Sequence, residues 1–174
     1  MTHPFAAVLA AIVLAACCSL PAAADPGTSL DPIPDKPAAP GFELEGRDGK
    51  TYRLAAMKGQ PVIVNFWATW CPPCRAEMPA MQRAWELVKD DGVMIVAVNV
   101  GESAEEIAAF LEQEPVEFPI PMDTNMAVSQ RWPMQGLPTT FVVDPEGHLV
   151  YRAQGERAWD DPALLDLVRG LRRQ

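Results

Sequence analysis

The sequence is short of positive charge. Its 174 residues include 14 lysines and arginines against 23 aspartates and glutamates, which gives a net charge of −9 at pH 7. Such a surface repels nucleic-acid phosphates, so a nucleic-acid partner is excluded and a neutral or basic partner is favoured. The length suits one domain with its own core plus a terminal tail, and a hydrophobic fraction of 49% is typical of a globular protein.

Cysteine and histidine are also scarce. The chain has four cysteines, at positions 17, 18, 71 and 74, and two histidines. A structural zinc site needs four ligands, and Cys71 and Cys74 are the one Cys-x-x-Cys pair, with His148 far along the chain. We therefore expect no metal site and no cofactor.

No apolar run near the N-terminus is long enough to span a membrane. The stretch AAVLAAIVLAACCSL has the length of a signal-peptide core, so residues 1–24 are predicted to be a signal segment. Small residues at 22–24 precede Asp25 and form a cleavage site, whereas LAAC, ending at Cys17, resembles the lipobox of bacterial lipoproteins. A lipidated Cys17, a cleaved secreted form and an uncleaved anchor all remain open.

The residues that follow are rich in proline and alanine. Residues 25–40 are predicted to be an extended tether, and residues 41–174 the folded domain. We expect the domain to lie in the periplasm or cell envelope, attached to a membrane through its N-terminus if Cys17 is lipidated.

The first half of the domain predicts alternating strands and helices. Residues 42–54 alternate around Asp48-Gly49, which indicates a β-hairpin. Residues 61–66 and 93–100 are runs of β-branched residues, typical of strands buried on both faces of a parallel sheet. Between them, apolar residues spaced by three and four predict a helix over 72–90, so the class is α/β.

The second half continues the pattern. Ser103 and Glu106 form a capping box that starts a helix, and the six glutamates between 102 and 117 read as a solvated face. Residues 118–123 predict a short strand, and residues 125–132 a short helix. Two strands follow over 139–152, joined by a turn, and a last helix begins at Asp161-Pro162.

Cys71 and Cys74 are separated by Pro72 and Pro73 at the start of the first predicted helix. Unpaired N–H groups at a helix N-terminus favour a thiolate, which predicts Cys71 as a nucleophile. Cys74 lies on the buried stripe, which suits a resolving thiol. A disulfide between residues three positions apart closes almost no loop and so adds little stability. It is therefore better explained as a redox-active disulfide than as a structural one.

Two longer motifs are informative, and the first of them contains the cysteine pair. The stretches VIVNFWATWCPPC (62–74) and GLPTTFVVDPEG (136–147) resemble the thioredoxin superfamily, specifically its exported TlpA/ResA/DsbE-like members, over about residues 40–174. The resemblance implies a thioredoxin-like fold, a central mixed β-sheet flanked by helices, with an N-terminal hairpin and a central insertion. It also implies a cis peptide at Pro138 facing the disulfide and a substrate contact at Leu137.

Several aromatic and polar residues near the cysteine pair are candidates either for the core or for the site. Trp67 is expected in the core, whereas Trp70, together with Pro72 and Pro73, is expected to contact substrate. Asn65 stands where cytoplasmic thioredoxins have a buried aspartate, and an amide takes no proton from Cys74. Glu77 is a candidate proton acceptor; the competing interpretation is an ordinary solvent-facing or salt-bridged helix residue.

The resemblance implies a thiol-disulfide oxidoreductase, more narrowly a protein-disulfide reductase. Its partners would be disulfides of client proteins, apocytochrome c among them, and a membrane thiol donor of electrons. The direction of electron flow is not encoded in the motif. Two alternatives are a copper-handling chaperone, for which no third ligand is evident near Cys71, and a redoxin-type peroxidase, for which the Pro-x-x-x-Thr-x-x-Cys motif is missing.

Overall fold

A computed structural model describes residues 26–173 of the chain. The predicted signal segment, the cleavage site and Cys17 lie outside the described residues. No helix within 26–173 combines the length and apolar character that crossing a membrane would require.

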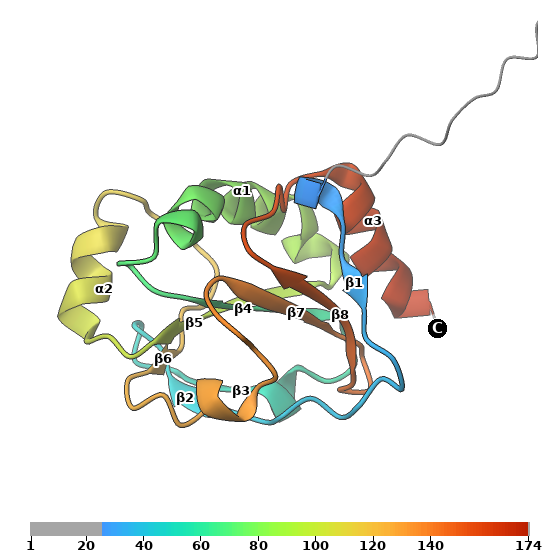
Figure 1. Ribbon diagram of the computed structural model, residues 1–174, viewed down its shortest axis with the longest axis horizontal. Coiled ribbons are helices and arrows are strands. Elements are labelled where there is room, and N and C mark those ends of the chain that lie inside the picture. The colour runs from blue at the N-terminus through green and yellow to red at the C-terminus, as the bar shows by residue number, and fades with distance from the viewer. Residues whose placement is uncertain (1–25, 174) are drawn as a thin grey trace, which may run out of the picture.

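The centre of the molecule is a mixed sheet of six strands in the order β1-β8-β7-β4-β5-β6 (Figure 1). β4, β5 and β6 run parallel, and β1, β8, β7 and β4 pair antiparallel. The strands are β1 Asp31–Pro32, β4 Val62–Trp67, β5 Met94–Val100, β6 Met122–Asp123, β7 Thr139–Val143 and β8 Leu149–Gln154. This arrangement confirms the predicted fold class.

Helices and a hairpin cover the two faces of the sheet. Figure 1 shows α1 and α3 over one face, and the hairpin of β2 and β3 beside the other. The helices are α1 Pro72–Val88, α2 Ala104–Leu111 and α3 Pro162–Gly170, and the hairpin strands are β2 Glu43–Glu45 and β3 Thr51–Arg53. Short 3-10 turns lie at Pro26–Thr28, Leu54–Met57, Lys89–Asp91, Ser129–Arg131 and Leu171–Arg173.

β4 divides the core because successive side chains of a strand point to opposite faces. Val64 and Phe66 belong to the apolar cluster on the hairpin side, whereas Ile63 and Trp67 belong to the cluster under α1. Trp67 is fully buried, which confirms its place in the core. Asn65 points to the α1 side in the same alternation and has no solvent exposure.

Several local predictions are confirmed. The hairpin forms around Asp48-Gly49, and the capping box of Ser103 and Glu106 opens α2 with both of its hydrogen bonds. Asp161 caps α3, with Pro162 at its first position.

Two predictions between α2 and β7 are wrong. The strand expected over 118–123 is reduced to β6, because Pro119 and Pro121 have no N–H to give to a ladder and offer only carbonyl acceptors to β5. The helix expected over 125–132 is one 3-10 turn, held by the carboxylate of Asp123, which accepts from the N–H groups of Val128 and Ser129 at 3.1 and 2.7 Å.

The described part of the predicted tether is largely docked on the sheet. Asp31 and Pro32 pair with β8, and Ile33 N–H donates to the Val150 carbonyl at 2.9 Å. Further along, Leu149 N–H donates to the Pro37 carbonyl at 2.8 Å. The open edge of β8 offers unpaired backbone groups, and an extended proline-rich segment satisfies them through both N–H groups and carbonyls. Residues 31–39 therefore lie along the sheet and are no free spacer.

Candidate active site

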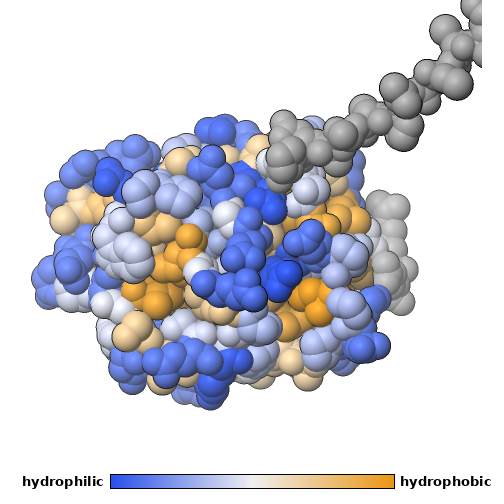
Figure 2. All heavy atoms as spheres, in the orientation of Figure 1, coloured by the Kyte–Doolittle hydropathy of each residue, from blue (hydrophilic) through white to orange (hydrophobic). Residues whose placement is uncertain are grey.

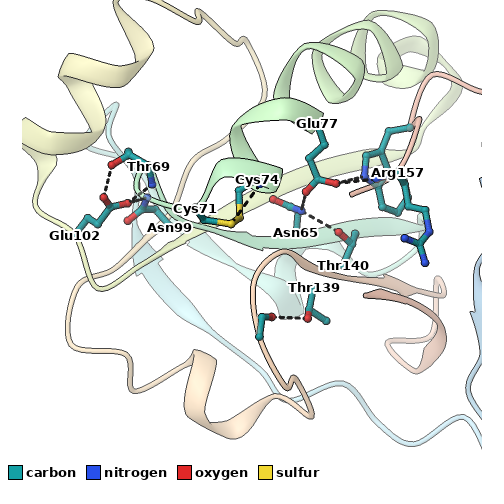
Figure 3. Close-up of a disulfide and its surroundings, with 12 residues drawn as sticks. Asn65, Thr69, Cys71, Cys74, Glu77, Asn99, Glu102, Thr139, Thr140 and Arg157 are labelled. Carbon is teal, nitrogen blue, oxygen red and sulfur yellow. Dashed lines mark hydrogen bonds between the residues drawn. A yellow bond between two sulfur atoms is a disulfide. The ribbon is translucent and has the colours of Figure 1, made fainter. Parts of the chain in front are cut away.

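Cys71 and Cys74 form a disulfide at the N-terminus of α1 (Figure 3). Cys71 is the N-cap residue of the helix, and its Sγ accepts a hydrogen bond from the Cys74 N–H at 3.3 Å. Cys74 is fully buried, as its position on the apolar stripe predicts, and Cys71 is only 3% exposed. Both cysteines are therefore buried in the disulfide form. They differ in position, because Cys71 is the N-cap of α1 and Cys74 lies within its first turn.

The rim of the site is formed by the residues that the motifs indicate. Trp70 is 68% exposed, Pro72 is exposed, and Pro73 and Leu137 are half-buried. The Leu137–Pro138 peptide bond is cis, and Thr139 pairs with Phe66, so this bond lies beside the end of β4 from which the Cys71 loop departs. Figure 2 shows apolar surface between α2 and the segment that leads into β7. A role of these residues in substrate binding stays a prediction.

Glu77 follows Cys74 by three residues and points into the protein. It is 2% exposed, which overturns the interpretation as a solvent-facing residue. Its Oε1 accepts from Asn65 Nδ2 at 2.8 Å, and its Oε2 accepts from Trp159 Nε1 at 3.0 Å and from the Arg157 N–H at 3.2 Å. These donors join α1 to β4 and to the loop after β8.

The environment of Glu77 changes its acidity. Burial raises the pKa of Glu77 from the ordinary 4.5 to about 7, and the hydrogen bonds from Trp159, Asn65 and Arg157 only partly oppose the effect. A carboxyl with such a pKa exchanges its proton near neutral pH. A cleft of about 320 Å³ lined by Ala80, Arg83 and Glu156 opens beside it.

A second buried glutamate lies on the opposite side of the disulfide in Figure 3. Glu102 is 5% exposed, so the prediction of a solvated face is wrong at this position. Its Oε2 accepts from the Thr69 N–H and from Asn99 Nδ2, both at 2.7 Å, and Thr69 Oγ1 donates to Oε1. Glu102 thus holds the loop that carries Trp70 and Cys71.

Sequence reasoning missed two groups at this site. Glu102 comes two residues after the end of the parallel strand β5. The carboxyl ends of such strands are where sites form in α/β sheets, so this position could have indicated a role at the site. The sequence around Trp159 contains no feature that predicts its contact with Glu77, because the two residues are far apart in the chain. Among residues 26–173, no group of three His, Cys, Asp or Glu side chains is placed to hold a metal ion.

A Cys-x-x-Cys disulfide at the start of a helix, a cis-proline before the neighbouring strand and a mixed central sheet define a thioredoxin-like protein. Comparison with known sequences makes the assignment narrower. The chain belongs to the AhpC/TSA family, whose sequence profile matches residues 36–152.

Two relatives with similar sequences are both named as thiol-disulfide oxidoreductases. The chain is 45% identical over 112 residues to the thiol-disulfide oxidoreductase ResA of Bacillus subtilis (strain 168), covering 64% of this chain and 63% of that protein. It is 38% identical over 123 residues to ResA of Geobacillus kaustophilus, covering 71% of each. The match thus spans less than two thirds of the Bacillus subtilis protein.

Solved structures agree with the fold. A candidate thiol:disulfide interchange protein DsbE from Chlorobium tepidum aligns with a TM-score of 0.73 at 32% identity, covering 83% of this chain and 99% of that one. A thioredoxin family protein, also a thiol:disulfide interchange protein of Chlorobium tepidum, aligns with a TM-score of 0.68 at 29% identity, covering 79% and 99%. The predicted thioredoxin-like, ResA/DsbE-like assignment is confirmed.

Proposed function

We propose that this protein is a thiol-disulfide oxidoreductase that reduces disulfides of other proteins outside the cytoplasm. The observation that carries the proposal is the Cys71–Cys74 disulfide at the N-terminus of α1, beside a buried carboxyl that titrates near neutral pH. The names of the ResA relatives support the same chemistry. The export is inferred from the signal segment in residues 1–24.

In the proposed reaction the dithiol is the reductant. The Cys71 thiolate attacks one sulfur of the client disulfide, a mixed disulfide forms, and the other client sulfur leaves as a thiolate. Cys74 then loses its proton and attacks Cys71 Sγ, which releases the second client thiolate and closes the Cys71–Cys74 bond. Two electrons pass from the enzyme to the client in each cycle.

Two local features support these roles. The Cys74 N–H that donates to Cys71 Sγ, together with the helix N-terminus, stabilises negative charge on Cys71. Side chains three positions apart on a helix are neighbours, so Glu77 is placed to take the proton that Cys74 gives up. The adjacent cleft gives that proton a path to solvent.

The roles of the two cysteines are tested by trapping. Reduced full-length Cys74→Ser is expected to retain a client protein as a mixed disulfide through Cys71, because no resolving thiol remains. The matched variant Cys71→Ser should retain far less. Gel analysis without reductant, followed by mass spectrometry of the linked peptides, measures both. Equal trapping by the two variants would reverse the assignment of the nucleophile.

The proposal extends to partners that the sequence suggested. The clients include apocytochrome c, a membrane thiol donor re-reduces the pair, and a lipid on Cys17 anchors the chain to the envelope. A reductant of this kind needs a reduction potential near or below about −230 mV, whereas a strong periplasmic oxidant lies near about −120 mV. Equilibration of the disulfide with glutathione buffers distinguishes the two directions.

A further inference from the structure

The side chain of Asn65 is buried beneath the first turn of α1 with only its amino group paired. Asn65 Nδ2 donates to Glu77 Oε1 at 2.8 Å and to Thr140 Oγ1 at 2.9 Å. Its Oδ1 has no hydrogen-bond donor among the described residues, although Asn65 has no solvent exposure. A buried acceptor without a donor is uncommon in folded proteins and calls for a reason.

The orientation of this amide is fixed by its neighbours. Rotating it by half a turn would turn Nδ2 away from both of its acceptors and, whenever Glu77 is ionised, would place the carbonyl oxygen against a carboxylate that has no proton to give. Oδ1 therefore faces away from Glu77 and Thr140. In Figure 3 the Asn65 side chain lies between Glu77 and the disulfide, with its oxygen on the side of Cys74.

Reduction of the disulfide creates one new buried donor at this place. In the oxidised protein neither sulfur carries a hydrogen. When the bond accepts two electrons and one proton, Cys71 is left as the thiolate and Cys74 as the thiol. Cys74 is fully buried, so its S–H group has no water to bind and needs an acceptor from the protein.

We propose that Asn65 Oδ1 accepts a hydrogen bond from the Cys74 S–H group in the reduced protein. Asn65 is then a positioning residue that keeps the resolving thiol protonated while Cys71 carries the negative charge. The inference rests on the proposed function, since it assigns a role within the same dithiol cycle. It explains why an amide suffices at this position: the residue holds the proton on sulfur without accepting it, and Glu77, three positions after Cys74 on α1, is the group that removes it.

The pairing also links the amide to the redox equilibrium. Oδ1 gains a donor only in the dithiol form, so Asn65 favours that form over the disulfide. Replacing Asn65 by alanine is expected to shift the equilibrium with glutathione about fivefold towards the disulfide, the effect of one ordinary hydrogen bond. Thr140→Val removes a partner of Nδ2 and leaves Oδ1 in place, so it should shift the equilibrium far less.

A direct test needs no substitution. The chain has three asparagines, Asn65, Asn99 and Asn125, so selective ¹³C labelling of asparagine side-chain carbonyls in the full-length protein gives three resonances. Asn99 is a matched control, because it is also buried and its Oδ1 also lacks a donor among residues 26–173. Reduction with a chemical thiol is expected to move the Asn65 resonance in the direction of stronger hydrogen bonding and to leave Asn99 nearly unchanged.

A second readout comes from Cys74 itself. In a full-length chain with Cys17→Ser, Cys18→Ser and Cys71→Ala, Cys74 is the one thiol, and its S–H infrared band should lie at lower frequency than in the same chain carrying Asn65→Ala. An unmoved Asn65 resonance, or equal movement of Asn65 and Asn99, would overturn the proposal. Both readings use the isolated protein, so they are independent of whether it reduces any client.

Discussion

Two buried glutamates lie on opposite sides of the disulfide. Each accepts from the amide of a strand asparagine and from a backbone N–H, but the third donor and the segments that supply the donors differ. Glu77 accepts from a strand amide, an indole and a backbone N–H, contributed by residues 65, 159 and 157. Glu102 accepts twice from Thr69 and once from Asn99. The first carboxyl joins segments that are up to 82 residues apart in the chain, whereas the second fastens the loop directly before Cys71.

The difference shows that burial alone does not give a carboxyl its role. Glu77 has a pKa of about 7 and lies one helical turn after Cys74, so it is suited to exchanging a proton. Glu102 is bound to the backbone and the hydroxyl of the same residue, an arrangement that fixes the course of the chain towards Trp70 and Cys71. Glu77 is therefore suited to proton transfer, and Glu102 to holding the loop before Cys71 in place.

The largest expected effect concerns Glu77 and is a change of the free energy of unfolding with pH. Glu77 binds its proton more tightly in the folded chain than in the unfolded one, so the folded state holds more protons between pH 4.5 and about 7. The free energy of unfolding therefore falls as pH rises through that window, by about 3 kcal/mol, and the full contribution is present only below the window. Glu77→Gln should abolish this part of the fall, as measured by urea unfolding from about pH 4 to pH 8.

Glu86→Gln is the matched control, since Glu86 is an exposed carboxyl on the same helix. Its stability curve should keep the slope of the natural protein. If Glu77→Gln also kept that slope, Glu77 would titrate at its ordinary pKa and its proposed part in proton transfer would be lost.

The next largest effect is expected from removing the carboxylate of Glu102. Glu102→Ala leaves the Thr69 N–H and the Asn99 amide without an acceptor, and we expect it to lower the free energy of unfolding by about 2 kcal/mol. The Thr69 amide should also exchange its hydrogen faster. Glu102→Gln retains an acceptor oxygen and offers an N–H to Thr69 Oγ1, so its loss should be smaller in both measurements. Equal losses in the two variants would argue against a hydrogen-bonded clamp.

The smallest expected effect comes from removing a single hydrogen-bond donor to Glu77. Trp159→Phe deletes the N–H that binds Glu77 Oε2, which should raise the pKa of Glu77 further and cost about 1 kcal/mol of stability at alkaline pH. Trp132→Phe is the matched control, because the indole N–H of Trp132 is buried without an acceptor within residues 26–173. The midpoint of the pH-dependent change in stability should move in the first variant and stay in place in the second.

Local signs in the sequence predicted much of this molecule. The capping box at Ser103, the Pro162 start of α3 and the hairpin at Asp48-Gly49 act within a few residues, and each appears in the structure. The cysteine pair was placed correctly at the start of α1 for the same reason. The resemblance, and no local rule, supplied the cis bond before Pro138.

The remaining features depend on contacts between distant segments. Glu102 stands in a run of glutamates that looks solvated, and only the meeting of β4 with β5 brings Thr69 against it. Trp159 reaches Glu77 across the loop after β8. The docking of residues 31–39 needs the open edge of β8 as a partner, and composition alone does not reveal that edge.

Both edges of the sheet end in strands of two residues, β1 and β6. Within β1, Pro32 has no N–H and Asp31 is charged, so this edge offers little on which a strand of another molecule could build. A chain shortened to begin at Gly41 would expose the six residues of β8 and would tend to aggregate edge to edge. The proline-rich segment thereby occupies an edge at which a strand of another molecule could otherwise pair.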